Sequence, residues 1–97
     1  MNELTFEWDN EKDKENQWKH GVSFEEARTV FYDEYARIIV DPDHSLEEDR
    51  FILLGLSSRL RMLAVCHCYR EGETKVRIIS ARKAVKRERK KYEEHLS

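Results

Sequence analysis

The sequence has little glycine, little proline and no long apolar stretch. Only three glycines and one proline, Pro42, occur among its 97 residues, so long flexible linkers are not expected. No apolar run approaches the ~20 residues that cross a bilayer. The first residues also lack the basic start and apolar run of a signal peptide. We therefore expect a cytoplasmic chain with no membrane partner, folded as one domain over residues 1–97.

Cysteine is scarce, and its spacing argues against both a disulfide and a metal site. Cys66 and Cys68 are the two cysteines; in a strand they share one face about 6.6 Å apart, which suits a disulfide poorly and fits a reducing compartment. His67 lies between them and is a weak candidate metal ligand, because a zinc site needs four converging ligands. The pattern favours buried apolar cysteines, no metal and no cofactor.

The net charge of −2 conceals a strong local asymmetry. Residues 75–92 contain nine Lys and Arg and one acidic residue, for a charge of +8, whereas the rest of the chain carries −10. One basic segment in a nearly neutral chain predicts a localised surface for anions. The alternative is a solvated helix face without a ligand.

Two helices are predicted after a short N-terminal strand. Residues 4–8 alternate as a strand should, and Asp9 and Gly21 are typical of the start and end of a helix over residues 10–20. Trp18 is expected to be its only large apolar anchor. Ser23 and Glu26 match a capping box that begins a second helix, residues 23–31. Its apolar face is predicted to comprise Phe24, Ala27, Val30 and Phe31.

The remaining chain predicts four strands and a basic helix. Apolar, β-branched segments at residues 36–40, 50–56, 62–69 and 75–81 are joined partly by links of hairpin length, which favours an antiparallel meander. Residues 82–95 are predicted to form a basic helix, docked through a thin apolar stripe of Ala81, Val85, Tyr92 and Leu96. The predicted fold class is α+β.

The segment from Lys75 to Tyr92 carries the main candidate site. Arg77 projects from a strand and Arg82 is expected where strand meets helix, and the guanidinium fork of Arg suits phosphate. Tyr92, among cations, can stack on a base while its neighbours hold the RNA backbone. Its alternative role is packing the helix on the sheet, and both roles are compatible if the hydroxyl stays exposed.

Two further places offer groups for proton transfer. His44, Glu48 and Arg50 surround a turn and a strand start, and His is the natural acid or base near neutral pH. A solvated loop with a salt bridge explains this cluster equally well. His20 ends a helix, where it either caps the helix dipole or contacts a ligand.

These segments together resemble the BrnT family, the toxins of bacterial type II toxin–antitoxin pairs. The resemblance covers nearly the whole chain and is carried by short motifs in a fixed order. They are FEWD at 6–9, KHGVSFEEA at 19–27, His44-Ser45 with Glu48 and Arg50, RIISARKA at 77–84, and Arg87-Glu88 with Tyr92. The resemblance implies a RelE-like fold, ribonuclease activity and neutralisation by a DNA-binding antitoxin.

The first functional hypothesis is a metal-independent endoribonuclease in which the 2′-OH of the RNA attacks the adjacent phosphate. Arg77 and Arg82 are predicted to stabilise charge, and His44, Glu48 or Tyr92 to move protons. The predicted RNA-binding residues are His20, Arg50, Lys83, Lys86, Arg87, Arg89 and Lys90. The alternatives are a non-catalytic RNA- or ribosome-binding module and a pure protein-interaction domain.

The resemblance also implies the partners. RNA is the expected substrate, a BrnA-like antitoxin is the expected protein partner, and DNA is met only through that antitoxin. Because the basic segment would steer an acidic partner, we expect the antitoxin and RNA to compete for it at least in part.

Overall fold

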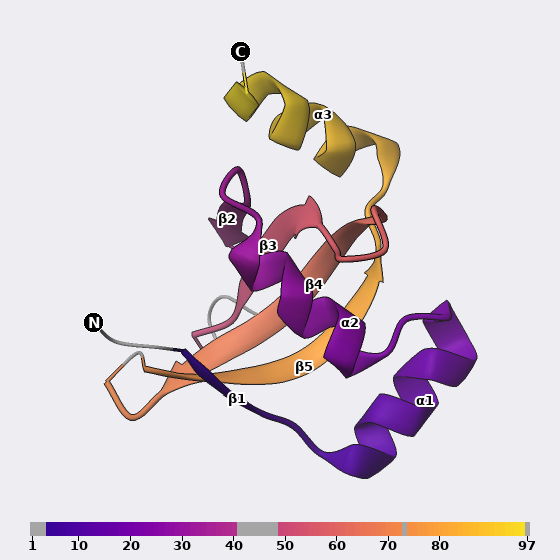
Figure 1. The fold of residues 1–97 in the computed structure, drawn as a ribbon, viewed down its shortest axis with the longest axis vertical. Helices are drawn as coiled ribbons and strands as arrows, with labels where there is room; N and C mark the ends of the chain where they lie inside the picture. The colour runs from indigo at the N-terminus through magenta and orange to yellow at the C-terminus, as the bar shows by residue number, and fades with distance from the viewer. Residues whose placement is uncertain (1–3, 41–48, 73, 97) are drawn as a thin grey trace.

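A five-stranded sheet with helices on one face and at one end forms the architecture of the computed structural model (Figure 1). The structure describes residues 4–40, 49–72 and 74–96. Its elements in chain order are β1 (Thr5–Glu7), α1 (Asn10–His20), α2 (Phe24–Thr29), the 3-10 turn η1 (Val30–Tyr32), β2 (Arg37–Val40), β3 (Phe51–Leu56), β4 (Met62–Arg70), β5 (Lys75–Lys83) and α3 (Lys86–Leu96).

The strand order is β1-β5-β4-β3-β2, and β2 to β5 form the predicted antiparallel meander. The sequence predicted the N-terminal strand but not its partner. β1 pairs in parallel with β5, with Thr5 opposite Lys75 and Glu7 opposite Arg77, so the sheet has a fifth strand and is mixed. This pairing brings Thr5–Glu7 beside the start of the basic segment. No helix in the described ranges is long and apolar enough to cross a membrane.

α1 begins and ends where predicted but is held in an unexpected way. The Asp9 side chain accepts hydrogen bonds from two backbone N–H groups of the first turn, and Gly21 ends the helix at φ 67°. The predicted anchor Trp18 is wrong, because its side chain is 86% exposed. Buried Asn16 anchors the helix instead: its amide donates to the carbonyls of Val22 and Ala81, and its oxygen accepts from the Ala81 N–H. The Asn16 carboxamide thus hydrogen-bonds the backbone N–H and C=O of Ala81 in β5, as a neighbouring strand would.

α2 covers one face of the sheet and closes the main core. Ser23 accepts from the Glu26 N–H at 3.1 Å, as the capping box predicted. The predicted apolar face is confirmed, with Phe24, Ala27 and Val30 fully buried and Phe31 packed against them. The sheet contributes Leu63, Val65, Val76, Ile78 and Ala81 to this core.

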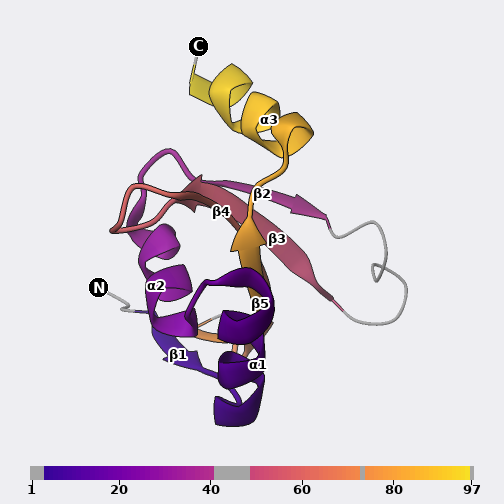
Figure 2. The same cartoon turned by 90° about the vertical axis from the view of Figure 1, so that its right-hand side faces the viewer.

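α3 lies apart from α1 and α2, at one end of the sheet (Figures 1 and 2). Tyr92 is 3% exposed and joins Ile52, Leu54 and Ala64 in a second apolar cluster on the other face of the sheet, called here the open face. Tyr92 therefore docks the helix as predicted, but the rest of the predicted stripe is wrong. Ala81 belongs to the main core, whereas Val85 and Leu96 are about half exposed.

The boundary between β5 and α3 differs from the predicted one at residue 82. β5 continues to Lys83 because Arg82 and Lys83 pair with Ala64 and Leu63 of β4, and the Ala84 N–H donates to the Met62 carbonyl. The helix begins only at Lys86. Backbone pairing with β4 therefore overrides the helical propensity of this Ala- and Lys-rich stretch.

Candidate nucleic-acid interface

A β-bulge places Arg77 and Arg82 on the same face of the sheet. They are five positions apart in the sequence, so regular alternation would put them on opposite faces. The pairing with β4 shifts between Cys66 and His67, and Ile79 is left without a partner of its own. Arg77 then lies opposite Cys68 and Arg82 opposite Ala64, both on the open face. At ~3.3 Å per residue the two arginines stand roughly 15 Å apart, too far to share one phosphate.

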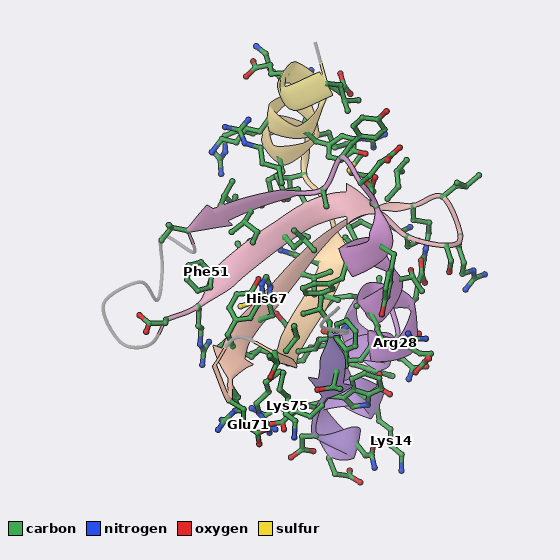
Figure 3. All side chains as sticks on the ribbon, turned by 60° about the vertical axis from the view of Figure 1, so that its left-hand side comes forward. Lys14, Arg28, Phe51, His67, Glu71 and Lys75 are labelled. Atoms are coloured by element: carbon green, nitrogen blue, oxygen red, sulfur yellow. The ribbon has the colours of Figure 1, made fainter. Side chains whose placement is uncertain are left out.

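Arg77 belongs to a group of three cations around one carboxylate. Its guanidinium donates to Glu7 Oε2 at 2.8 Å, while Arg70 approaches the same oxygen at 3.5 Å and Lys75 approaches Oε1 at 3.8 Å. Lys75 also lies 3.4 Å from Glu71, and Figure 3 shows these two side chains together near the turn between β4 and β5. The hydrogen bond from Arg77, with the nearby Lys75 and Arg70, holds the pKa of Glu7 below its usual value. This group, Glu7 with Arg70, Lys75 and Arg77, is called the β5 cluster below.

Arg82 holds the start of α3. Its two terminal nitrogens donate to both oxygens of Glu88, at 2.7 and 2.9 Å, and Glu88 also accepts from the Val85 N–H at 3.0 Å. The hydrogen bonds from Arg82 keep the pKa of the buried Glu88 carboxyl low despite its desolvation. The Arg82 side chain is about one-third exposed.

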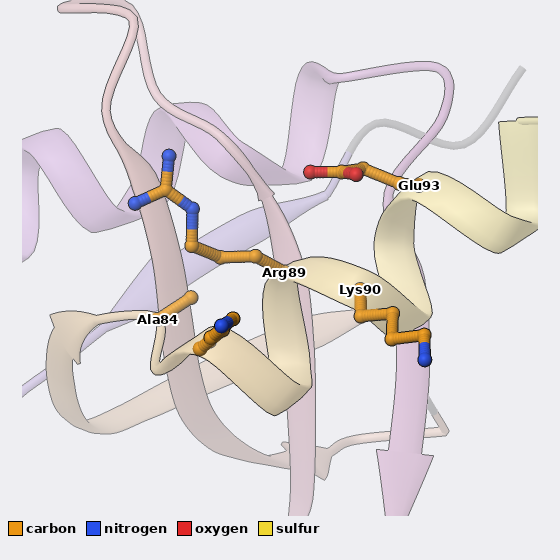
Figure 4. A pocket seen from close by; sticks show the side chains of 5 residues that line it. Ala84, Arg89, Lys90 and Glu93 are labelled. Atoms are coloured by element: carbon orange, nitrogen blue, oxygen red, sulfur yellow. The ribbon is translucent and has the colours of Figure 1, made fainter.

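One side of α3 forms a basic hollow of about 720 Å³ (Figure 4). It is lined by Ala84, Lys86, Arg89, Lys90 and Glu93. Three of the predicted RNA-binding cations are therefore brought together. Arg87 is exposed on the same helix but does not line the hollow. Lys83 is exposed opposite Leu63, on the face away from Arg82.

His20 lies beside the bulge of β5. It lines a hollow of about 230 Å³ between the end of α1 and the strand, together with Lys12, Glu15, Asn16, Lys19, Ile79 and Ser80. Ser80 lies opposite Cys66 and so belongs to the open face. Three basic residues of α1, namely Lys12, Lys19 and His20, thus lie along β5 between the β5 cluster and Arg82.

Tyr92 is enclosed rather than presented to a ligand. Its hydroxyl donates to Asp33 Oδ2 at 2.7 Å, and burial together with this carboxylate raises the pKa of Tyr92 to about 12. The predicted exposed hydroxyl is therefore wrong, and a ring this buried does not stack on a base in the observed arrangement. The physical reason is that the ring fills the gap between α3 and the sheet, where it meets Ile52 and Leu54.

The predicted proton-transfer cluster before β3 lies mostly outside the described residues. His44 and Glu48, two of the predicted proton-transfer residues, lie outside the described residues. Arg50 is half-buried directly before β3.

Cys66 and Cys68 lie on the open face and are not joined in a disulfide, whereas His67 points into the opposite side. The imidazole is fully buried against Phe31, and burial lowers its pKa. In Figure 3 His67 lies beside Phe51. Across residues 4–40, 49–72 and 74–96, no group of three or more His, Cys, Asp or Glu side chains is placed to hold a metal ion.

Sequence reasoning did not single out Glu7, Arg70 or Asn16. The sequence pattern that could have indicated Glu7 is the alternation of polar and apolar residues in the strand. Glu7 occupies the polar position between Phe6 and Trp8 and must face away from the core. Nothing local connects Glu7 to Arg77, because the contact spans 70 residues.

Comparison with known proteins gives the fold and the family. No curated protein matches this chain. The crystal structure of the Brucella abortus ribonuclease toxin BrnT is similar, with a TM-score of 0.65 and 24% sequence identity over 86% of this chain and 99% of that one. A family model described as the ribonuclease toxin BrnT of type II toxin–antitoxin systems matches residues 8–88. The chain therefore belongs to the BrnT family of type II toxin–antitoxin ribonuclease toxins.

Proposed function

We propose that this protein is an endoribonuclease that cleaves RNA without a metal ion, with the RNA lying along β5 on the open face. The observation that supports this most strongly is the β5 cluster, in which Arg70, Lys75 and Arg77 converge around Glu7. Three cations surround Glu7 and one of them, Lys75, also contacts Glu71, so the local net charge available to a phosphate is +1. The side chains of Lys75 and Arg77 are about one-third exposed, so a ligand can reach them.

The same face offers further positive charge in line with the strand. Along β5, the β5 cluster is followed by the hollow at His20 and then by Arg82. The basic hollow of Lys86, Arg89 and Lys90 on α3 comes next. A linear series of cations suits a single-stranded backbone, whose phosphates repeat along the chain. In this arrangement Arg50 and Arg87 contact flanking nucleotides, whereas Lys83, on the opposite face of β5, does not reach the RNA.

The proposed reaction needs no group beyond RNA and side chains. The 2′-OH oxygen bonds to the adjacent phosphorus, the bond to the 5′-oxygen breaks, and the products carry a 2′,3′-cyclic phosphate and a 5′-OH. Arg77 stabilises the negative charge of the transition state, with Arg82 on a neighbouring phosphate. His44 and Glu48, outside the described residues, remain proposed proton carriers, one of them as the acid that protonates the leaving 5′-oxygen. The buried contacts of Tyr92 suit it instead to holding α3.

The test is cleavage of a defined RNA by the purified protein in the presence and absence of EDTA, with the product ends identified. We expect undiminished cleavage in EDTA and cyclic phosphate ends. Binding without cleavage would favour an RNA- or ribosome-binding module, and loss of activity in EDTA would exclude the metal-independent reaction.

Two matched arginine variants test whether the reaction takes place at Arg77. Arg77→Gln is expected to lower cleavage at least 100-fold, since one stabilising donor commonly contributes 10²–10³ in rate. Arg59→Gln is the control, because the Arg59 side chain is 73% exposed and its guanidinium lies 4.0 Å from Glu26. Equal activity of the two variants would remove Arg77 from the site.

A type II family implies a protein antitoxin, and we place a BrnA-like antitoxin with an acidic segment over α3. The cations that line the α3 hollow would meet that segment, so antitoxin and RNA would exclude each other, while DNA would be bound only by the antitoxin. We also propose a cytoplasmic location, because Cys66 and Cys68 are not joined in a disulfide. Titrating antitoxin into a complex of RNA with the Arg77→Gln variant should release the RNA at one antitoxin per toxin. A stable ternary complex would contradict occlusion.

A further inference from the structure

We propose that Glu7 is the proton acceptor that activates the 2′-OH of the RNA. The inference rests on the proposed function and assigns the base to a described residue at the centre of the cation group. Glu7 is the carboxylate in direct hydrogen-bonding contact with Arg77, and its side chain is 31% exposed, so substrate can reach it.

Three other carboxylates of the described chain are less suited to accept a proton. Both oxygens of Glu88 are occupied by Arg82, and its side chain is 9% exposed. Asp33 accepts from the Leu56 and Tyr35 N–H groups and from the Tyr92 hydroxyl. Glu71 is exposed but contacts Lys75 and not Arg77. Glu7 therefore combines access with direct contact to the arginine that would hold the reacting phosphate.

The charges facing Glu7 are Arg77 and Lys75 on β5 and Arg70 on β4. They keep its carboxylate ionised in the free protein, as a base must be. A phosphodiester bound to the same three cations would compete with Glu7 for them. The pKa of Glu7 would then rise when RNA binds, and its basicity would increase at the moment it is needed.

The step is balanced without any further reactant except water. The 2′-O–H bond breaks and its proton passes to Glu7 as the 2′-oxygen bonds to phosphorus. The bond from phosphorus to the 5′-oxygen then breaks, and the leaving oxygen takes a proton from the proposed acid, directly or through water. Glu7 returns its proton to solvent when the product leaves.

The experiment compares Glu7→Gln with Glu71→Gln, two variants that remove one negative charge beside Lys75. Only Glu7→Gln removes a carboxylate that touches Arg77. For Glu7→Gln we expect kcat to fall 100-fold or more, the usual contribution of a positioned base, while RNA binds as tightly as before or more tightly. Glu71→Gln should keep at least one-third of wild-type kcat.

A fall of less than tenfold in kcat for Glu7→Gln overturns the proposal. So does an equal fall in both variants, or a loss explained by weaker RNA binding, because those results indicate charge or fold rather than proton transfer. The pH profile of the wild type gives a second readout that requires no variant. The acid limb of kcat should lie at higher pH than that of kcat/KM, and coincident limbs would contradict the competition for cations. If the wild type does not cleave RNA at all, the proposed function itself fails and the role of Glu7 with it.

Discussion

Replacing Tyr92 with Phe separates the structural role of this residue from a chemical one. The ring keeps its contacts with Ile52, Leu54 and Ala64, so the apolar burial is unchanged. What disappears is the 2.7 Å hydrogen bond from the hydroxyl to Asp33. A hydrogen bond to a charged group contributes about 1.5–3 kcal/mol, and Asp33 keeps its two backbone donors, Leu56 and Tyr35. We therefore expect the lower part of that range.

Thermal unfolding followed by circular dichroism measures the effect. A loss of about 1.5 kcal/mol in a domain of this size corresponds to a fall in Tm of at least about 6 °C. Tyr92→Ala should cost more, about 3–5 kcal/mol, because it also empties the space under α3. The pH dependence gives an independent check. Burial raises the pKa of Asp33, but its hydrogen bonds from Leu56, Tyr92 and Tyr35 outweigh this and hold it below 3.8. The difference between wild type and Tyr92→Phe should be full above pH 3.8 and shrink as the pH falls through the folded-state value.

The same variant decides whether Tyr92 takes part in cleavage. Per folded molecule, Tyr92→Phe should cleave RNA within about twofold of wild type, because the Tyr92 hydroxyl is buried and already donates to Asp33. Unchanged stability would refute the account of how α3 is held. A tenfold loss of cleavage in fully folded protein would return Tyr92 to the chemistry.

Three further predictions concern the framework of the site. Glu88→Gln should lower the free energy of unfolding in urea by about 1 kcal/mol near neutral pH. Arg82 depresses the pKa of Glu88 below 4.5 in the folded protein. The difference from wild type should therefore persist above pH 4.5 and vanish as the pH falls through the folded-state pKa of Glu88. Gly55→Ala should cost about 1–3 kcal/mol in the same assay, because a Cβ there would lie 2.9 Å from Val30 Cγ1 and 3.0 Å from Asp33 Oδ2; an equally stable variant would show that these neighbours move aside easily. Changing both Cys66 and Cys68 to Ser should leave cleavage unchanged apart from a loss of stability, and stoichiometric zinc in the wild-type protein by elemental analysis would contradict this.

Local signals predicted much of the fold. Asp9, Gly21 and Ser23 act on backbone groups within a few residues, so their capping roles can be read from the sequence. The meander of β2 to β5 was similarly accessible, because apolar segments joined by short links have few other ways to pair.

Contacts between distant parts of the chain produced the errors. A polar helix with one tryptophan suggested an apolar anchor, but Asn16 attaches the helix to the backbone of Ala81, 65 residues away. The end of β5 was missed because pairing with β4, rather than local propensity, decides the structure of Arg82 and Lys83. Glu88 accepts a hydrogen bond from the Val85 N–H just before the first turn of α3. The predicted helix over residues 82–95 had instead placed Glu88 inside the helix.

The candidate site was predictable in composition but not in arrangement. Its positive charge is visible in the sequence, but the bulge at Ile79 alone decides that Arg77 and Arg82 share a face. The members of the β5 cluster come from β1, β4 and β5, and only the parallel pairing of β1 places Glu7 among them.

The measurement that tests the central claim most directly is the salt dependence of binding to a single-stranded RNA made uncleavable by removing its 2′-hydroxyls. The double variant Lys75→Gln/Arg77→Gln is compared with Lys14→Gln/Arg59→Gln, which removes the same two charges at exposed positions, one on α1 and one in the turn between β3 and β4. If RNA lies along β5, the first pair should weaken binding and reduce the slope of log K against log salt by about 1.4, or ~0.7 for each lost phosphate contact. The control pair should leave the slope unchanged. Equal slopes for the two double variants would contradict an RNA path along β5.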